Sequence, residues 1–316
     1  MAPEKAVGPA GLVMTAAVAR RYYVDGASKS DIAAELDLSR FKVARLLDEA
    51  RASGLVRIEF AYPAELDVDL SVRLQAAFGL RHGVVVNGPE DDDVGLRASL
   101  GQVAADLLTE IVRPDDVLGL VWARTLVAMR ASLERLAPCP VIQLTGSLSR
   151  PDVDESSVEL VRDVARISGG QAHWFYAPMI VPDAATARTM RTQPEIATAL
   201  ELARGVTKAV VGVGAWSPGL STVADAVTDK ERRAAHKLGV RAELGGIQID
   251  ADGNPVTTPL TERLIGIDAE HLRAVEDVIG IVYGVKKADA LRAALRGGFL
   301  KSVVTHSAMA RALLEP

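Results

Sequence analysis

Two short helical patterns, separated by a tight break, lie near the start of the chain over residues 28–53. In each, apolar residues recur three and four positions apart, which is the spacing of one face of a helix. The break is only Asp37-Leu38, so the helices must cross sharply, as in a helix-turn-helix whose second helix is presented outward. The apolar positions are Ile32, Ala33 and Leu36 in the first helix and Val43, Leu46, Leu47 and Ala50 in the second, and the N-caps are Ser28 or Ser30 and Ser39.

The face that the second helix turns to solvent is expected to be basic. From Leu38 to Leu47 the chain has three basic residues and no acidic one, although its formal net charge is −5. Positive charge on the leading turns of such a helix suits contacts with DNA phosphates and hydrogen bonds from arginine to guanine. The alternative is a solvated helix pair in a larger helical domain, but the much larger remainder of different build favours DNA binding. The residues expected to contact DNA are Ser28, Lys29, Ser39, Arg40, Phe41, Lys42, Ala44 and Arg45.

Flanking segments complete this N-terminal module. Residues 13–24 have a helical pattern, residues 55–60 alternate like a short strand that could act as a wing, and residues 66–78 predict a connecting helix. The predicted division is a disordered tail at 1–12, a winged helix-turn-helix DNA-binding domain at 13–61, and an effector-binding and oligomerisation domain at 62–316.

Beyond residue 62 the pattern changes to strands that alternate with helices. The expected strands are nearly all apolar, which predicts an α/β domain with a mainly parallel, doubly wound sheet buried on both faces. The strands are expected at 84–87, 117–122, 141–144, 173–177, 208–214, 277–284 and 299–305. The helices are expected at 94–112, from about residue 125, and at 155–167, 286–295 and 307–314.

The turns after these strands are where a ligand of such a sheet binds, close to the N-termini of helices. They supply small residues, hydroxyl groups and two cations, Arg124 and Lys287, which suits a small phosphorylated sugar or polyol. Each turn alone is weak evidence, because Gly and Ser are common in any turn from strand to helix. The turns are 122–125, 145–149, 212–214, 284–287 and 305–307.

The composition argues against several other classes of protein. A pI of about 5.7 argues against unspecific coating of nucleic acid. Cys139 is the only cysteine, and the five histidines are dispersed, so neither a disulfide nor a metal site is expected. Gly212-x-Gly214 lacks the rest of a dinucleotide fingerprint, so no cofactor is expected either. No apolar run reaches the roughly 18 residues of a membrane span, and no signal peptide is recognisable, which predicts a cytoplasmic protein.

Taken together, these motifs resemble the SorC family of sugar-responsive bacterial transcriptional regulators. Residues 22–58 are similar to the family's helix-turn-helix module, and the remainder is similar to its effector-binding domain. The order and spacing of the motifs make the resemblance specific, and it covers essentially everything after the N-terminal tail. The motifs are VWARTL at 121–126, VIQLTGSLS at 141–149, YAPMIV at 176–181, VVGVG at 210–214, IDADGNPV at 249–256, KKADALRAALRGG at 286–298 and SVVTHSAMA at 302–310.

The resemblance implies a fold similar to the sugar-phosphate isomerases, effectors that are usually phosphorylated sugars, and an assembly that is usually tetrameric. It also implies roles for single residues. Arg124 and Thr125 correspond to the family's phosphate-binding turn, and Gly146 and Ser147 to the next ligand turn. Glu243 stands where many members have an Asp that contacts sugar hydroxyls.

Lys287 matches the family's lysine, but four other positions depart from the family pattern. Ala123 replaces a frequent Gly, and Tyr283 stands where the family usually has the first of two glycines. Glu243 is one methylene longer than Asp, and His306 replaces a usual Asp. These differences bear on the identity of the effector. The expected effector-binding residues are Trp122, Ala123, Arg124, Thr125, Gly146, Ser147, Glu243, Tyr283, Lys287 and His306.

Three functions fit these features to different degrees. The first is a regulator that binds double-stranded operator DNA with an affinity set by a carbohydrate effector. Because one helix-turn-helix buries little surface, such a regulator is expected to be a homodimer or homotetramer. The second is an enzyme of the sugar-phosphate isomerase type, for which Glu243 or His306 could supply the general base, although no convincing acid-base set accompanies them. An oligomeric scaffold without ligand fits least well.

Overall fold

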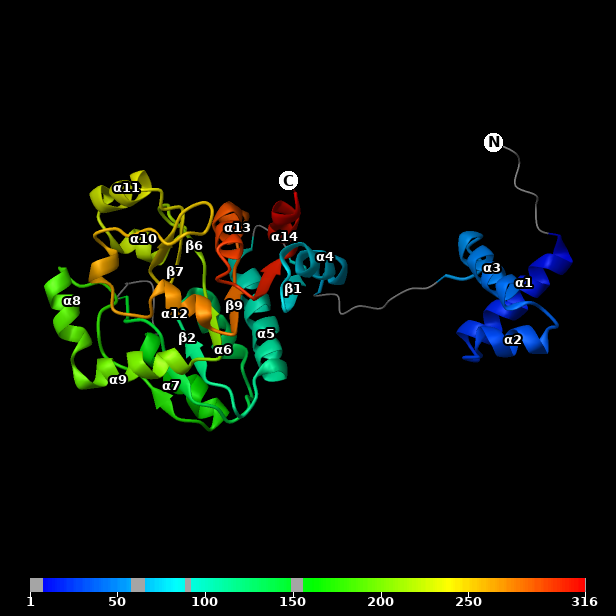
Figure 1. The fold of residues 1–316 in the computed structure, drawn as a ribbon, viewed down its shortest axis with the longest axis horizontal. Helices are drawn as coiled ribbons and strands as arrows, with labels where there is room; N and C mark the ends of the chain where they lie inside the picture. The colour runs from blue at the N-terminus through cyan, green and yellow to red at the C-terminus, as the bar shows by residue number, and fades with distance from the viewer. Residues whose placement is uncertain (1–7, 58–65, 89–91, 149–155, 316) are drawn as a thin grey trace. The chain divides into compact units, whose positions relative to one another are not determined.

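The structure, a computed structural model, describes residues 8–57, 66–88, 92–148 and 156–315. The chain divides into two compact units, residues 1–61 and residues 62–316 (Figure 1). The first unit contains helices α1 (Pro9–Tyr23), α2 (Lys29–Glu35) and α3 (Arg40–Ala52). Within the described parts of the chain, no helix has both the length and the apolar character needed to cross a membrane.

The core of the first unit is formed by the predicted apolar faces. All four stripe residues of α3 are buried against α1 and α2, which leaves the opposite face of α3 in solvent. Helix α1 begins at Pro9, earlier than predicted, so part of the expected tail is helical; a proline at the first helical position has its φ already set for a helix. The core residues are Val18, Ala19, Ile32, Ala33, Val43, Leu46, Leu47 and Ala50.

The strand predicted at residues 55–60 is absent from its described part. After α3, Gly54 takes a left-handed conformation with φ +73°, and the N–H of Val56 donates to the carbonyl of Ala50 at 2.9 Å. This hydrogen bond folds the chain back onto the end of the helix, as in a common helix C-cap, and residues 55–57 form no strand. The rest of the predicted wing, residues 58–60, lies outside the described residues.

The second unit contains the predicted parallel sheet. Seven strands pair in the order β1-β10-β9-β5-β2-β3-β4, and every pair is parallel. This confirms the fold class read from the apolar runs. The strands are β1 (His82–Val86), β2 (Leu118–Leu120), β3 (Val141–Gln143), β4 (Ala172–His173), β5 (Lys208–Val211), β9 (Asp277–Ile281) and β10 (Ser302–His306).

Helices cover both faces of this sheet, as Figure 1 shows. Consecutive strand residues, such as Val303 and Val304, belong to two different core clusters, which places one cluster on each face. One face is covered by α4 (Val68–Phe78), α13 (Ala288–Arg296) and α14 (Ser307–Leu314), whose apolar residues join the first cluster. The other face is covered by α5 (Asp93–Ile111), α6 (Arg124–Ser132) and α7 (Ser157–Ser168).

A small lobe that the sequence reading did not predict is inserted after β5. The apolar run predicted as one strand over 208–214 ends at Val211, and Gly214–Ala215 is β6 of a separate antiparallel sheet, ordered β6-β7-β8. Likewise, β4 stops at His173, short of the predicted residue 177. The lobe also contains α10 (Thr222–Ala226), α11 (Asp229–Lys237), β7 (Ala242–Leu244) and β8 (Ile247–Ile249). Outside it, α8 (Ala184–Arg191) and α9 (Pro194–Leu202) lie between β4 and β5, and α12 (Ala269–Ala274) precedes β9. Single 3-10 turns occur at Ala203–Gly205, Thr261–Arg263 and Val285–Lys287.

Candidate DNA-binding helix and effector cavity

The solvent face of α3 carries the cations expected to meet DNA. Arg40 and Arg45 are exposed, Lys42 is half-buried, and the ring of Phe41 is 88% exposed. Among the described residues, no carboxylate forms an ion pair with Arg40, Lys42 or Arg45, whereas Arg21 of the same unit pairs with Asp25 and Glu35. The face therefore presents unneutralised positive charge on the leading turns of a capped helix.

The other predicted DNA contacts lie at helix starts. The Ser39 Oγ accepts the N–H of Lys42 at 3.1 Å and caps α3. Ser28 and Asp31 form a reciprocal capping box at the start of α2. Lys29 lies with its Nζ 5.8 Å from the centroid of the Tyr22 ring. The caps fix the starts of α2 and α3, the turns that would approach a DNA backbone. The small, half-buried side chain of Ala44 would let DNA come close to the backbone of α3.

A cavity of about 450 Å³ lies at the carboxyl edge of the parallel sheet, where it meets the small lobe. This volume is within the range of small-molecule sites. All but one of the expected effector-binding residues line it. The exception is Ser147, whose Oγ is hydrogen-bonded to the Oγ of Ser157. The expected residues that do line the cavity are Trp122, Ala123, Arg124, Thr125, Gly146, Glu243, Tyr283, Lys287 and His306.

Two cations of the cavity lie at helix starts. Arg124 begins α6, and Ala123 before it provides no side-chain cap. Lys287 ends a 3-10 turn and immediately precedes α13, again without a side-chain cap. The N–H groups of Lys287 and Ala288 are already bonded within the 3-10 turn, to the carbonyls of Gly284 and Val285. The start of α6 beside Arg124 is therefore the helix end whose amides suit a phosphate or carboxylate group, and Lys287 adds a cation. Thr125 is buried and donates its hydroxyl to the carbonyl of Ile281 at 3.1 Å, which ties the first turn of α6 to the end of β9.

Glu243 lies on β7 of the small lobe and is 5% exposed. Its Oε1 accepts the hydroxyl of Ser221 at 2.8 Å, and its Oε2 accepts the N–H of Gly246 at 3.0 Å. Burial raises the pKa of the Glu243 carboxyl, and the opposing effects of these hydrogen bonds and of Lys287 are smaller. Glu243 and Lys287 both line the cavity, and no ion pair within 4.0 Å joins them in the described structure.

Gly214 explains how the carboxyl of Glu243 fits. A Cβ atom at Gly214 would lie 2.2 Å from Oε1 of Glu243 and 2.6 Å from Cβ of Ser221, so no larger residue is possible with this arrangement. The second glycine of the Gly212-x-Gly214 segment therefore serves the carboxylate rather than a dinucleotide. Gly212 is also confined, because its Cβ would lie 2.9 Å from that of Ala123.

His306 closes the cavity between the ends of β10 and β9. The residue is 2% exposed, and its Nε2 accepts the N–H of Gly284 at 3.1 Å. An accepting Nε2 requires the neutral ring with its proton on Nδ1. Gly284 has φ +86°, a conformation that glycine adopts readily, and it begins the turn that carries Lys287. His306 therefore holds the turn from which both Tyr283 and Lys287 project.

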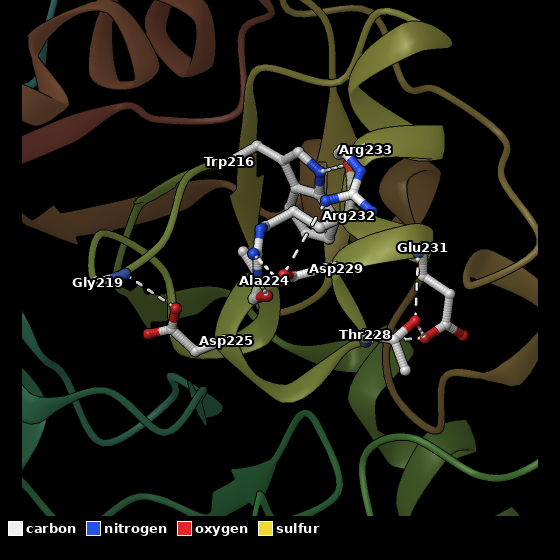
Figure 2. Close-up of polar contacts among 9 residues, drawn as sticks. All are labelled: Trp216, Gly219, Ala224, Asp225, Thr228, Asp229, Glu231, Arg232 and Arg233. Atoms are coloured by element: carbon white, nitrogen blue, oxygen red, sulfur yellow. Dashed lines mark hydrogen bonds and ion pairs between the residues drawn. The ribbon is translucent and has the colours of Figure 1, made fainter.

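The small lobe forms the remaining wall, and a network of polar contacts fixes it (Figure 2). The N–H of Gly219 donates to Asp225 at 2.9 Å, and the indole N–H of Trp216 donates to the carbonyl of Arg232 at 3.0 Å. The Arg232 side chain in turn reaches the carbonyl of Ala224 at 3.1 Å and pairs with Asp229. These contacts hold the segment that lines the cavity against α11.

Sequence reasoning missed several polar lining residues. Ser221, Thr222 and Asp225 lie in the inserted lobe, whose short elements gave no pattern, and Asp93 lies in the first turn of α5. Ser221 could have been recognised as the N-cap of a short helix, since it accepts the N–H of Ala224. Its contact with Glu243 could not be predicted from the sequence, because serine is common in loops and turns and its presence does not indicate a distant partner.

Comparisons with known proteins give a consistent answer for the second unit. Residues 62–315 match the family described as "Putative sugar-binding domain". The chain is 28% identical to the transcriptional regulator YjhU of Escherichia coli strain K12 over 302 residues, which is 93% of this chain and 92% of that protein. It is 27% identical to the deoxyribonucleoside regulator of Bacillus subtilis over 300 residues, 94% and 96% of the two chains.

One solved structure shares the fold over nearly the full length of the chain, and another over about four fifths of it. The full-length sorbitol operon regulator SorC from Klebsiella pneumoniae superposes with a TM-score of 0.75 at 21% identity, covering 96% of this chain and 99% of that one. A domain of a possible sugar-binding transcriptional regulator from Arthrobacter aurescens superposes with a TM-score of 0.72 at 22% identity, covering 81% and 100%.

Proposed function

Because the chain belongs to the sugar-binding domain family, and with it to the SorC family of sugar-responsive transcriptional regulators, we propose that its α3 reads operator DNA and that its cavity binds a phosphorylated sugar or polyol. The observation that carries the proposal is the cavity itself. It combines an uncapped helix start and two cations, Arg124 and Lys287, with a buried carboxylate, Glu243. Such a combination of groups matches a ligand with an anionic group and hydroxyl groups.

In this proposal Arg124, Lys287 and nearby backbone amides bind the anionic group. Glu243 uses its remaining lone pairs to accept hydroxyl groups, with Ser221 and Gly246 fixing its orientation. Thr125 and Gly146 shape the turns, and Trp122 contributes an apolar wall. Ser147 acts indirectly, through Ser157, because it does not line the cavity.

The DNA-binding contribution rests on the α3 face. Arg40 and Arg45 are the residues suited to base edges, and Lys42 is suited to phosphate. Phe41 is the one strongly exposed apolar side chain on this face, which fits contact with a thymine methyl group or a sugar. A protein that reads chromosomal operators acts in the bacterial cytoplasm, and it binds them as a homodimer or homotetramer.

A catalytic function is the second candidate, because Glu243 and His306 both line the cavity. Both groups are already engaged: Glu243 accepts two hydrogen bonds, and the Nε2 of His306 accepts another. A general base must be free to take a proton from the substrate. Turnover of a panel of sugar phosphates, followed by NMR, would favour the enzyme, and unchanged substrates together with binding favour the regulator.

Ligand binding is tested by thermal denaturation of the full-length protein with free and phosphorylated sugars and polyols. A specific ligand raises the midpoint by mass action. We expect phosphorylated compounds to stabilise the wild type and to have little effect on Lys287→Ala. The matched control is Lys237→Ala, an exposed lysine on α11. Equal stabilisation of both variants would place the anion site elsewhere.

A further inference from the structure

The ring of Tyr283 contacts two cations in the part of the cavity where Lys287 would bind an anionic group. The Nζ of Lys287 lies 4.8 Å from the ring centroid, and the guanidinium carbon of Arg97 lies 5.6 Å from it. Both distances are within the range of cation–π contacts. Tyr283 and Lys287 line the cavity, whereas Arg97 does not. The ring therefore closes the cavity on the side where Arg97 lies.

Arg97 has weak partners for a guanidinium. It projects from α5, where its Nε donates to the backbone carbonyl of Asp93 at 3.1 Å. Its Nη1 lies 3.5 Å from the hydroxyl of Tyr283, which is a long hydrogen bond. In the part of the chain that the structure describes, no carboxylate forms an ion pair with it. A guanidinium in this state retains most of its capacity to bind an anion in a bidentate geometry.

The positive charges at this end of the cavity influence one another. Burial lowers the pKa of Lys287, and Arg124 and Arg97 act in the same direction, while Glu243 and Asp93 oppose them. Lys287, Arg124 and Arg97 therefore lie close enough together for their charges to interact. What prevents a ligand from using Arg97 is the side chain that stands between Arg97 and the cavity.

We propose that Tyr283 is a specificity-determining residue, whose ring restricts the effector to a single anionic group at Lys287 and shields Arg97 from a second, adjacent one. The inference rests on the proposed effector site. Ligands with two adjacent anionic groups, as in a pyrophosphate, are excluded by the volume of the ring. With the ring removed, Arg97 becomes the second half of an anion site that Lys287 begins.

The test compares binding of inorganic phosphate and inorganic pyrophosphate to the full-length protein by calorimetry. Wild type and Tyr283→Phe, which keeps the ring, should bind pyrophosphate no more tightly than phosphate. Tyr283→Ala should shift the ratio of the two affinities at least tenfold toward pyrophosphate. Adding Arg97→Ala to Tyr283→Ala should remove that gain. A ratio unchanged in Tyr283→Ala, or a gain that survives the loss of Arg97, would overturn the inference.

A second measurement does not depend on the stability of the truncated variant. Arg97→Ala alone should leave phosphate affinity within about threefold of wild type, because the ring keeps Arg97 out of the cavity; a tenfold loss would show that Arg97 already binds the ligand and would overturn the inference. Failure of the effector site has a different signature. In that case Lys287→Ala would bind phosphate as the wild type does, whatever residue occupies position 283.

Discussion

Some residues that line the cavity also form hydrogen bonds that hold its wall in place. His306 is the clearest example, because its Nε2 accepts the Gly284 N–H at the start of the turn that carries Lys287. Glu243 likewise holds Gly246 and Ser221 while it faces the cavity. Substitution of such residues separates their effect on ligand binding from their effect on folding only when a conservative variant preserves the contact.

For His306 we predict that the acceptor, rather than the ring, is what effector binding needs. His306→Ala should weaken effector binding by roughly 1 kcal/mol, about fivefold, because the Gly284 N–H loses its partner. His306→Gln offers a carbonyl oxygen and should recover most of the affinity. Calorimetric titration with the phosphorylated ligand found by thermal denaturation measures both. If the glutamine variant binds as weakly as the alanine variant, His306 has only a space-filling role.

Glu231 provides a residue-scale prediction of pH dependence. Hydrogen bonds from Thr228 and the contact with Arg263 lower the pKa of its carboxyl to about 2. A lowered pKa means that the contribution to stability is full above the unfolded value of about 4.5 and is lost as the pH falls through about 2. With a discount for partial exposure, Glu231→Gln should lower the free energy of unfolding by roughly 1–2 kcal/mol at pH 7.

Urea denaturation across the pH range measures this effect. The difference between wild type and Glu231→Gln should shrink below about pH 4.5 and disappear near pH 2. Glu110→Gln, at an exposed position of α5, is the matched control and should show no such trend. A difference that stays constant down to pH 2 would mean that Glu231 stabilises the lobe through packing alone.

At the scale of elements, helix α3 bears most directly on function, because its exposed face is the proposed DNA-binding surface. Its buried stripe and its cap set which side chains face outward, and Arg40, Lys42 and Arg45 have no ion-pair partners among the described residues. Arg40→Ala and Arg45→Ala should each cost about 1–3 kcal/mol of operator binding and relax sequence specificity where the arginine reads a base.

Lys42→Ala should behave differently, because a phosphate contact carries no sequence information. It should weaken binding to all DNA sequences and lower the salt slope by roughly one unit. Fluorescence anisotropy with operator and unrelated DNA at several salt concentrations distinguishes the two classes. Unchanged operator affinity in the Arg40/Arg45 double variant would contradict the assignment of α3 as the recognition helix.

The length of an element decided how well the sequence predicted it. Helix α3 and strand β10 were recognisable because several periods of their apolar pattern were present. The strands of the small lobe have two or three residues each, which is too few for an alternating pattern. The strand predicted from residue 55 does not form over residues 55–57 for another reason, because Gly54 allows the chain to fold back onto α3.

The cavity shows the same limit for side chains. Arg124 and Lys287 were predictable, because a cation at the start of a helix after an apolar strand has a known geometry. The contact between Tyr283 and Arg97 was not, since 186 positions separate the two residues in the sequence. Nor was the arrangement of Ser221 beside Glu243, which depends on how the inserted lobe packs. Ser147 was expected in the cavity, but its hydroxyl is directed to Ser157.

At the scale of the whole molecule, the proposed function requires more than one copy of the chain. Exposed apolar side chains are available for contacts between copies. They are Val13 on α1 at 68%, Val24 just after α1 at 72%, and Val72 on α4 at 61%. We predict a dimer or tetramer at micromolar concentration by light scattering, with and without DNA. A monomer under both conditions would contradict operator binding by paired modules.

The measurement that most directly tests the account is a titration of operator binding with effector. Wild type, Lys287→Ala and Glu243→Ala are compared with the control Lys237→Ala. Without effector, all four should bind operator with nearly equal affinity, because neither cavity residue lies in the DNA-binding unit. With effector, the affinity should change in wild type and Lys237→Ala and stay constant in the two cavity variants. A normal response to effector in both cavity variants would contradict the account.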